Sequence, residues 1–238
     1  MLAWLRAALA ADAPHHGRRE FKFVLSPMSE RGAVSLVRAR VPALRREFAP
    51  RQVSSLYFDS ASYSCYHQSN AGVSERTKVR LRWYGDLEPS TPLTLELKHR
   101  ASHLGWKSQY TLGAGDLAHV DLRDLHRRFA EFVAPAERGA VGMLRMPILV
   151  TSYFRHYFAT LDGGIRVTVD GGLCFADQRR SQRLRLSGAG CASDLTVVEC
   201  KMAPARVGDA AGLLRGLPQR HGRFSKYCHA LERLTESG

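Results

Sequence analysis

The segment ERTKVRLRWY, residues 75–84, decides the fold because cationic and apolar side chains alternate along it. Four cations stand at every second position: Arg76, Lys78, Arg80 and Arg82. The apolar residues Val79, Leu81 and Trp83 stand at positions between them. A period of two is that of a β-strand, whose successive side chains point to opposite faces. The segment therefore predicts a strand with one cationic face and one apolar face.

The same alternation recurs before and after this segment. The polar faces of the other segments carry Arg18, Glu20 and Lys22; Thr94, Glu96 and Lys98; Tyr153 and Arg155; Arg166, Thr168 and Asp170; and Glu199 and Lys201. A solvated outer face is the ordinary explanation of such a pattern. Two features favour an enclosed face instead: like charges at every second residue repel one another at a surface, and glutamates are interleaved with the cations.

The pattern predicts an α+β chain that is mainly β, a closed antiparallel β-barrel that forms a tunnel, with flanking helices over its apolar exterior. Residues 1–17 read as a flexible leader and residues 18–238 as one domain. Strands are expected at residues 18–25, 53–58, 75–84, 93–98, 106–112, 148–159, 165–169, 182–186 and 196–201. Helices are expected at residues 26–41, 116–132 and 205–234, the last with a break near 216–218.

Composition narrows the function. The 238 residues carry a net charge of +13, which attracts polyanions: nucleic acid, acidic membrane or phosphate chains. The five cysteines form no CxxC pair and are odd in number, which argues against a zinc site and against a disulfide framework, and favours a reducing compartment. The apolar leader is too short for a convincing signal peptide or membrane span, so a cytoplasmic protein is expected.

Eight short motifs, in this order and spacing, resemble the VTC (vacuolar transporter chaperone) domain, the polyphosphate polymerase branch of the triphosphate tunnel metalloenzymes. They are REFKFVL (19–25), SLYFDSASY (55–63), KVRLRWYG (78–85), LELKHR (95–100), YFRHYF (153–158), IRVTVD (165–170), VVECK (197–201) and FSKY (224–227). The resemblance implies a basic tunnel that holds the triphosphate of ATP and a growing polyphosphate chain.

Carried onto this chain, the resemblance implies site residues of three kinds. The expected catalytic cations are Lys22, Arg80, Arg82, Lys98, Arg155, Arg166 and Lys226. Further phosphate-binding residues are Lys78, Lys107, Tyr153, Lys201, Arg223 and Ser225. Glu199, with Glu96 and Glu20, is expected to hold Mn²⁺ or Mg²⁺, because hard cations prefer oxygen ligands.

Two departures from the family pattern bear on the activity. The opening signature of the superfamily has two glutamates before its lysine, whereas here Arg18 stands at the earlier position and only Glu20 remains. This weakens a two-metal hydrolase and favours the polymerase branch. Arg223 stands where members of the family carry lysine, which keeps the charge but not the geometry.

The expected reaction is transfer of the γ-phosphoryl group of ATP to polyphosphate. A tunnel-fold triphosphatase and a non-catalytic polyphosphate-binding module remain open alternatives. The expected partners are ATP and polyphosphate or triphosphate, with a membrane-protein partner left open. Nucleic acid is not expected, because glutamates share the cationic faces. Asp59 and Asp170 fit either residues that orient tunnel arginines or residues at turns and sheet ends.

Overall fold

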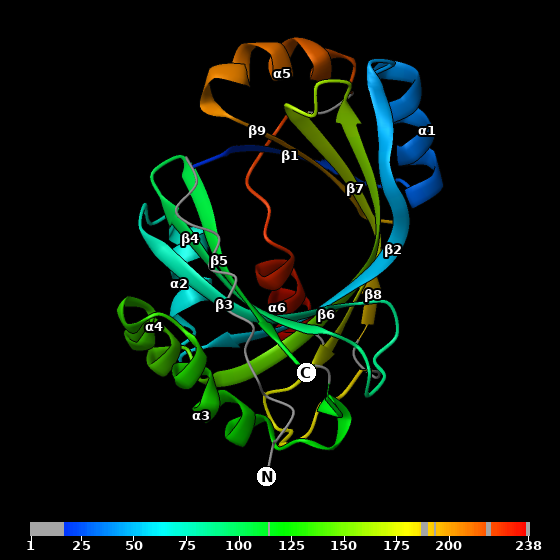
Figure 1. The fold of residues 1–238 in the computed structure, drawn as a ribbon. Coiled ribbons are helices and arrows are strands. Elements are labelled where there is room, and N and C mark those ends of the chain that lie inside the picture. Colours follow the sequence, from blue (N-terminus) through cyan, green and yellow to red (C-terminus); the bar gives the residue numbers. More distant parts are fainter. Residues whose placement is uncertain (1–16, 114, 187–189, 193, 218–219, 237–238) are drawn as a thin grey trace.

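The computed structural model describes residues 17–236 except 114, 187–189, 193 and 218–219. The predicted leader lies outside the described residues apart from Gly17. The described strands form one antiparallel sheet, which curls around a common interior (Figure 1). Its order is β1 (Arg19–Leu25), β9 (Thr196–Met202), β7 (Ile165–Asp177), β6 (Met146–Thr160), β2 (Leu44–Asp59), β3 (Arg76–Tyr84), β4 (Leu93–Ala101) and β5 (Leu104–Leu112), and β8 (Gly190–Ala192) pairs with β7.

The sheet is not closed into a barrel, so the prediction of full closure is wrong. Its edge strands β1 and β5 meet at one backbone bridge among the described residues, where the amide nitrogens of Arg18 and Gly105 lie 3.1 and 3.3 Å from each other's carbonyl oxygens. Beyond this bridge the seam is crossed by side chains: Lys98 Nζ of β4 lies 3.2 Å from Glu20 Oε2 of β1. The physical reason is that β1 uses one edge to pair with β9 along its whole length, while its other edge diverges from β5 directly after the bridge at Arg18.

Helices cover the outer face of the sheet. α3 (Leu122–Phe132) packs Leu122, Leu125 and Phe129 into a buried cluster with the apolar face of β3. α2 (Ser64–Ala71) and α4 (Arg138–Met143) lie on the same side, whereas α1 (Glu30–Arg40) and α5 (Val207–Leu213) cover β1, β7 and β9 (Figure 1). No helix in the described part of the chain has the length and apolar character that crossing a membrane requires.

The last helix differs from its prediction. The predicted break near residues 216–218 is wider than expected: α5 ends at Leu213 and α6 (Lys226–Glu236) begins only at Lys226, and in Figure 1 α6 lies inside the ring that the strands outline. The segment that leads to α6 is tied to β1, because Gly222 donates its backbone N–H to Lys22 O at 2.8 Å. The chain therefore brings residues that immediately precede α6, and α6 itself, to the inner face of the sheet.

Residues 182–186 do not form the predicted strand. Their alternation of cations and leucines fits a strand, but the backbone of Arg185 forms its hydrogen bonds with a side chain instead of with a neighbouring strand. Gln178 donates to Arg185 O at 2.6 Å and accepts from Arg185 N at 3.0 Å, which satisfies both backbone groups within a loop. Period-two patterning cannot show this, because it does not reveal whether a partner strand exists.

The cysteine expectation needs one correction. Cys174 of β7 stands directly opposite Cys191 of β8 and is joined to it by a disulfide. Cys65, Cys200 and Cys228 are free and buried. An odd cysteine count excludes full pairing but not one cross-strand pair, which depends on strand register.

Candidate functional site

The charged faces of the strands point into the interior. On β3 the apolar residues between the cations, Val79, Leu81 and Trp83, are at most 1% exposed under the helices, so the cations face the other way. Glu96 and Glu199 are 1% and 6% exposed, and Arg82 and Arg155 are also buried. A solvated outer face is therefore the wrong interpretation of this alternation.

Glu199 is the centre of a first cluster, the Glu199 cluster. Four cations from three strands and α6 surround its carboxylate: Lys201 at 3.1 Å, Lys226 at 3.2 Å, Lys22 at 3.6 Å and Arg155 at 3.6 Å. Burial alone would raise the pKa of Glu199, but Lys226 and Lys201 hold it well below its usual value. The group is therefore a carboxylate at neutral pH.

Asp170 completes the Glu199 cluster. It accepts two hydrogen bonds from Arg155 and one from Lys226, each at 2.6 Å, and its side chain is fully buried. The Tyr153 ring lies 4.7 Å from Lys226 Nζ and 5.2 Å from the Arg155 guanidinium carbon. Asp170 thus orients Arg155, one of its two predicted roles. Asp59 has the other predicted role, that of a residue at a sheet end. It is the last residue of β2, accepts a hydrogen bond from Cys65 N at 2.9 Å at the start of α2, and does not contact the tunnel arginines.

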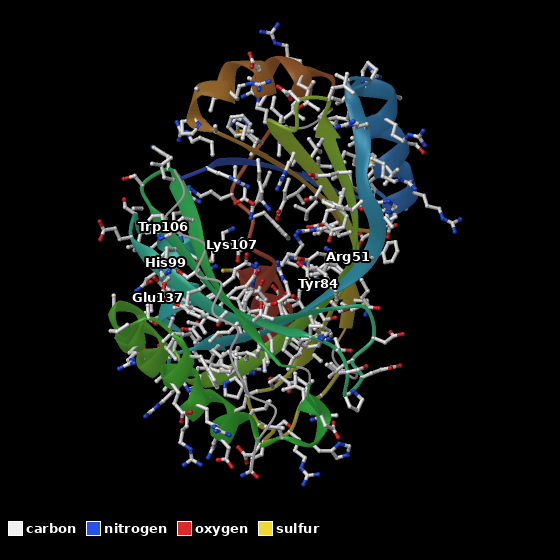
Figure 2. The ribbon with its side chains drawn as sticks, viewed as in Figure 1. Arg51, Tyr84, His99, Trp106, Lys107 and Glu137 are labelled. Carbon is white, nitrogen blue, oxygen red and sulfur yellow. A yellow bond between two sulfur atoms is a disulfide. The ribbon has the colours of Figure 1, made fainter. Side chains whose placement is uncertain are left out.

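Glu96 is the centre of a second cluster on β3, β4 and β5. Its oxygens lie 2.5 Å from Arg80 Nη2, 3.3 Å from Arg82 Nη1 and 3.6 Å from Lys107 Nζ, and Gln109 donates to it at 2.7 Å. Arg80 also donates to the Tyr57 hydroxyl at 3.1 Å. Figure 2 shows Lys107 on the inner side of β5, opposite to the labelled Trp106.

Glu20 links the walls at the seam. Lys98 lies 3.2 Å from its carboxylate, Lys201 3.7 Å and Lys22 3.9 Å. Burial would raise the pKa of Glu20, but Lys22 and Lys98 lower it to about 2. Glu20 raises the pKa of Lys98, yet burial and the neighbouring lysines outweigh this and lower it to about 8. Lys98 can therefore lose its charge in mildly alkaline solution, near pH 8.

The segment before α6 adds the remaining predicted residues. Lys22 Nζ donates to Phe224 O at 2.9 Å, and Lys78 Nζ donates to Ser225 Oγ at 3.0 Å. Arg223 lies apart from both clusters, at one end of the interior beside Arg76 and Arg100. Apart from Arg166, the predicted residue set is therefore brought to one interior, with Arg223 at its edge.

Arg166 lies at the rim. Its side chain is 51% exposed and pairs with Glu47 at 3.3 Å, although the strand register places it on the same face as Asp170. Arg51 and Tyr84 lie at the same rim and were missed by the sequence reading. The Arg51 guanidinium stacks on Tyr84 at 3.9 Å and approaches Tyr157 at 5.3 Å (Figure 2). The signal was present for Tyr84, which continues the alternation of Lys78, Arg80 and Arg82.

A divalent cation fits two of the three predicted glutamates. Glu20 and Glu199 share Lys22 and Lys201 as partners, and Glu20 Oε1 is buried without a hydrogen-bond partner. Such an oxygen suits Mg²⁺ or Mn²⁺ when phosphate oxygens supply the other ligands. Glu96 lies in the other cluster, where both of its oxygens accept hydrogen bonds. No cluster of three metal-ligating side chains occurs among the residues that the structure describes.

A comparison with protein families agrees with the sequence motifs. A family profile described as the VTC domain matches residues 17–235. No curated protein matches the chain. Among solved structures, a candidate adenylate cyclase from Vibrio parahaemolyticus is 13% identical with a TM-score of 0.47, covering 91% of this chain and 99% of that one. A protein from Pyrococcus horikoshii is 14% identical with a TM-score of 0.46, covering 92% and 99%. An inorganic triphosphatase is 14% identical with a TM-score of 0.30, covering 90% and 97%. Because the profile spans nearly the whole chain, the protein belongs to the VTC domain family.

Proposed function

We propose that this protein is a metal-dependent polyphosphate polymerase that transfers the γ-phosphoryl group of ATP to a growing polyphosphate chain. The observation that carries the proposal is the charge of the interior. The described residues place nine cations there against four carboxylates: Lys22, Lys78, Arg80, Arg82, Lys98, Lys107, Arg155, Lys201 and Lys226 against Glu20, Glu96, Asp170 and Glu199. Such an excess of positive charge favours binding of a polyanion, which would neutralise it.

Both clusters suit a phosphoryl transfer, because each presents a guanidinium group to phosphate oxygens. Arg80 and Arg155 present forked guanidinium groups, which bind phosphate oxygens in pairs, and buried carboxylates already fix both forks. Phosphoryl transfer depends on positioning and charge neutralisation more than on a covalent nucleophile. A divalent cation held by Glu199 and Glu20 would neutralise charge on the phosphates.

In the proposed reaction, a terminal oxygen of polyphosphate bonds to the γ-phosphorus. The bond between that phosphorus and the β–γ bridging oxygen breaks, and ADP leaves with the electron pair. Lys226 and Lys22 both lie beside Oε1 of Glu199, at 3.2 and 3.6 Å, and would hold the oxygens that gain charge.

A nucleotide substrate is supported by the rim. Arg51, Tyr84 and Tyr157 form a cationic and aromatic group at one mouth, and Tyr84 is 38% exposed. Stacking on an aromatic ring binds any nucleobase face, and arginine adds a cation–π contribution. The base of ATP can therefore rest at the rim while its triphosphate enters.

The decisive experiment is incubation of the protein with ATP and Mn²⁺, followed by separation of products by size. Long polyphosphate with stoichiometric ADP supports the polymerase. Release of inorganic phosphate without polymer supports the triphosphatase, in which water replaces the phosphate oxygen. Glu199→Gln should abolish turnover and keep polyphosphate binding. If folded wild-type protein binds polyphosphate but turns over no ATP, the enzyme proposal is wrong and a binding module is favoured.

A further inference from the structure

Three arginines meet at one end of the interior. Arg76 of β3 and Arg100 of β4 stand directly opposite each other in the strand register, and Arg223 reaches them from the segment before α6. Together with Gly72, Ser74, Ser102 and His103 they line a pocket of about 180 Å³. We call this group the arginine pocket. Its volume leaves room for a phosphate-sized group.

The arginine pocket lacks the carboxylates that neutralise the rest of the interior. Its lining residues include no Asp or Glu, and none of the three arginines forms an ion pair with a described residue. Arg76 donates to Val73 O, and Arg100 donates to Ser102 O at 3.0 Å. Burial, then Arg100 and Arg223, lower the pKa of Arg76. Three like charges held together without a counter-charge repel one another, and a bound anion relieves that repulsion.

Gly72 fixes Arg223 in this pocket. It ends α2 with a φ of 71°, in the left-handed region that favours glycine. A Cβ at this position would collide with the Arg223 guanidinium. The Arg223 guanidinium therefore packs against the bare backbone of Gly72 at the pocket wall, while Arg223 and Arg100 both remain exposed to solvent.

The arginine pocket continues the cationic faces of the tunnel. Arg76 lies two residues from Lys78 on one face of β3, and Arg100 lies two residues from Lys98 on one face of β4, steps of about 7 Å along a strand. Lys78 also donates to Ser225, two residues from Arg223. An extended anion that leaves the Glu96 cluster along these strands meets Lys78 and Lys98 first and the arginine pocket next.

We propose that the arginine pocket is a second phosphate subsite, which binds the part of a polyphosphate chain that lies beyond the reacting end. This inference rests on the proposed function and adds to it a preference for long chains over triphosphate. Single-stranded nucleic acid is a poorer occupant, because the described lining of the pocket contains no aromatic ring of Phe, Tyr or Trp on which bases could stack.

The test compares two ligands on one double variant. Arg76→Gln/Arg100→Gln should bind inorganic triphosphate within about twofold of wild type, measured by titration calorimetry, because its central cations are intact. Its affinity for polyphosphate of tens of phosphates should fall about tenfold or more. The slope of log affinity against log salt should drop by about 1 to 2, since each phosphate contact contributes about 0.7 in a single chain.

Matched controls separate local from general charge effects. Arg31→Gln/Arg38→Gln removes two exposed arginines of α1 and should leave both affinities unchanged. Gly72→Ala should displace the Arg223 guanidinium and weaken long-chain binding in the same direction. Melting temperatures of all variants show whether they fold.

Several outcomes overturn the inference. Unchanged long-chain affinity in the folded Arg76→Gln/Arg100→Gln variant does so, as does an equal loss for both ligands. Wild-type protein that binds triphosphate but holds long chains no more tightly refutes the subsite and leaves the proposed function intact. Wild-type protein that binds neither ligand refutes both. Tighter binding of a single-stranded oligonucleotide than of polyphosphate of equal charge assigns the pocket to nucleic acid instead.

Discussion

Replacing Glu199 with glutamine should destabilise the ligand-free protein and increase the stabilisation that a phosphate chain gives it. Glu199 is 6% exposed and has four cations within 3.6 Å. Glutamine keeps the size of the side chain and removes its charge. The four cations then face one another with only Asp170 and Glu20 as counter-charges.

The magnitude follows from burial. Removing one partner of a buried ion pair costs about 3–5 kcal/mol, because the remaining charge stays out of water. Asp170 still neutralises Arg155 and Lys226, so the lower end, about 3 kcal/mol, is expected. For a chain of this length, about 2–4 °C of melting temperature corresponds to each kcal/mol, so the melting temperature should fall by about 6–12 °C.

The pH dependence of this loss has a fixed sign. The pKa of Glu199 lies well below its usual 4.5 in the folded protein, so the stability that its charge contributes is fully present above pH 4.5. That contribution is lost as the pH falls toward the lowered pKa. The difference in melting temperature between wild type and Glu199→Gln should therefore be constant near neutral pH and shrink in acid.

The assay is thermal unfolding in metal-free buffer, with and without inorganic triphosphate. Triphosphate should raise the melting temperature of Glu199→Gln more than that of wild type, because its oxygens replace the missing carboxylate. Glu131→Gln is the control: Glu131 is 60% exposed beside Arg128, so its loss should matter by less than about 1 kcal/mol. The reasoning fails if Glu199→Gln melts like wild type, or if triphosphate stabilises both proteins equally.

Three further predictions concern the rim, the seam and the core. Tyr84→Ala should raise KM for ATP about tenfold by removing a base-stacking surface, with triphosphate binding unchanged; equal KM values in steady-state assays would contradict it. Lys98 has a pKa of about 8, so triphosphate affinity should fall as it loses its proton between pH 7 and 9. Burial would raise the pKa of the Tyr57 hydroxyl, but Arg80 lowers it to about 8, so Tyr57 ionises in the same pH range. Lys98→Arg should therefore abolish the fall in affinity when it is made in a Tyr57→Phe background. A fall that persists in this double variant would show that another group causes it. Asp59→Ala should cost about 3 kcal/mol in urea unfolding, because a fully buried carboxylate that accepts from Tyr227 at 2.6 Å is lost; a loss under 1 kcal/mol would refute that.

The sequence predicted the inner face of the sheet well, because the physics is local. Alternation along residues 75–84 places Arg80 and Arg82 on one side and Trp83 on the other, and any half-buried strand must follow that period. The same argument extended to Tyr84 would have found the rim group. Arg76 was on a predicted face too, whereas Arg100 lies beyond the predicted end of its strand at Lys98, and only the strand register shows that the two stand opposite each other.

Long-range features were beyond the sequence. The separation of Glu96 from the pair Glu20 and Glu199 depends on strand order, since β4 and β9 lie on different walls. The disulfide depends on the register of Cys174 against Cys191. The open seam between β1 and β5 depends on where two edge strands diverge, which no residue pattern specifies.

The most direct measurement is a crystal structure of the protein with inorganic triphosphate and Mn²⁺. The account predicts phosphate oxygens within hydrogen-bond distance of Arg80, Arg155 and Lys226, and the metal on Glu199. An anion bound only on the outer surface, with the interior ion pairs unchanged, would contradict it.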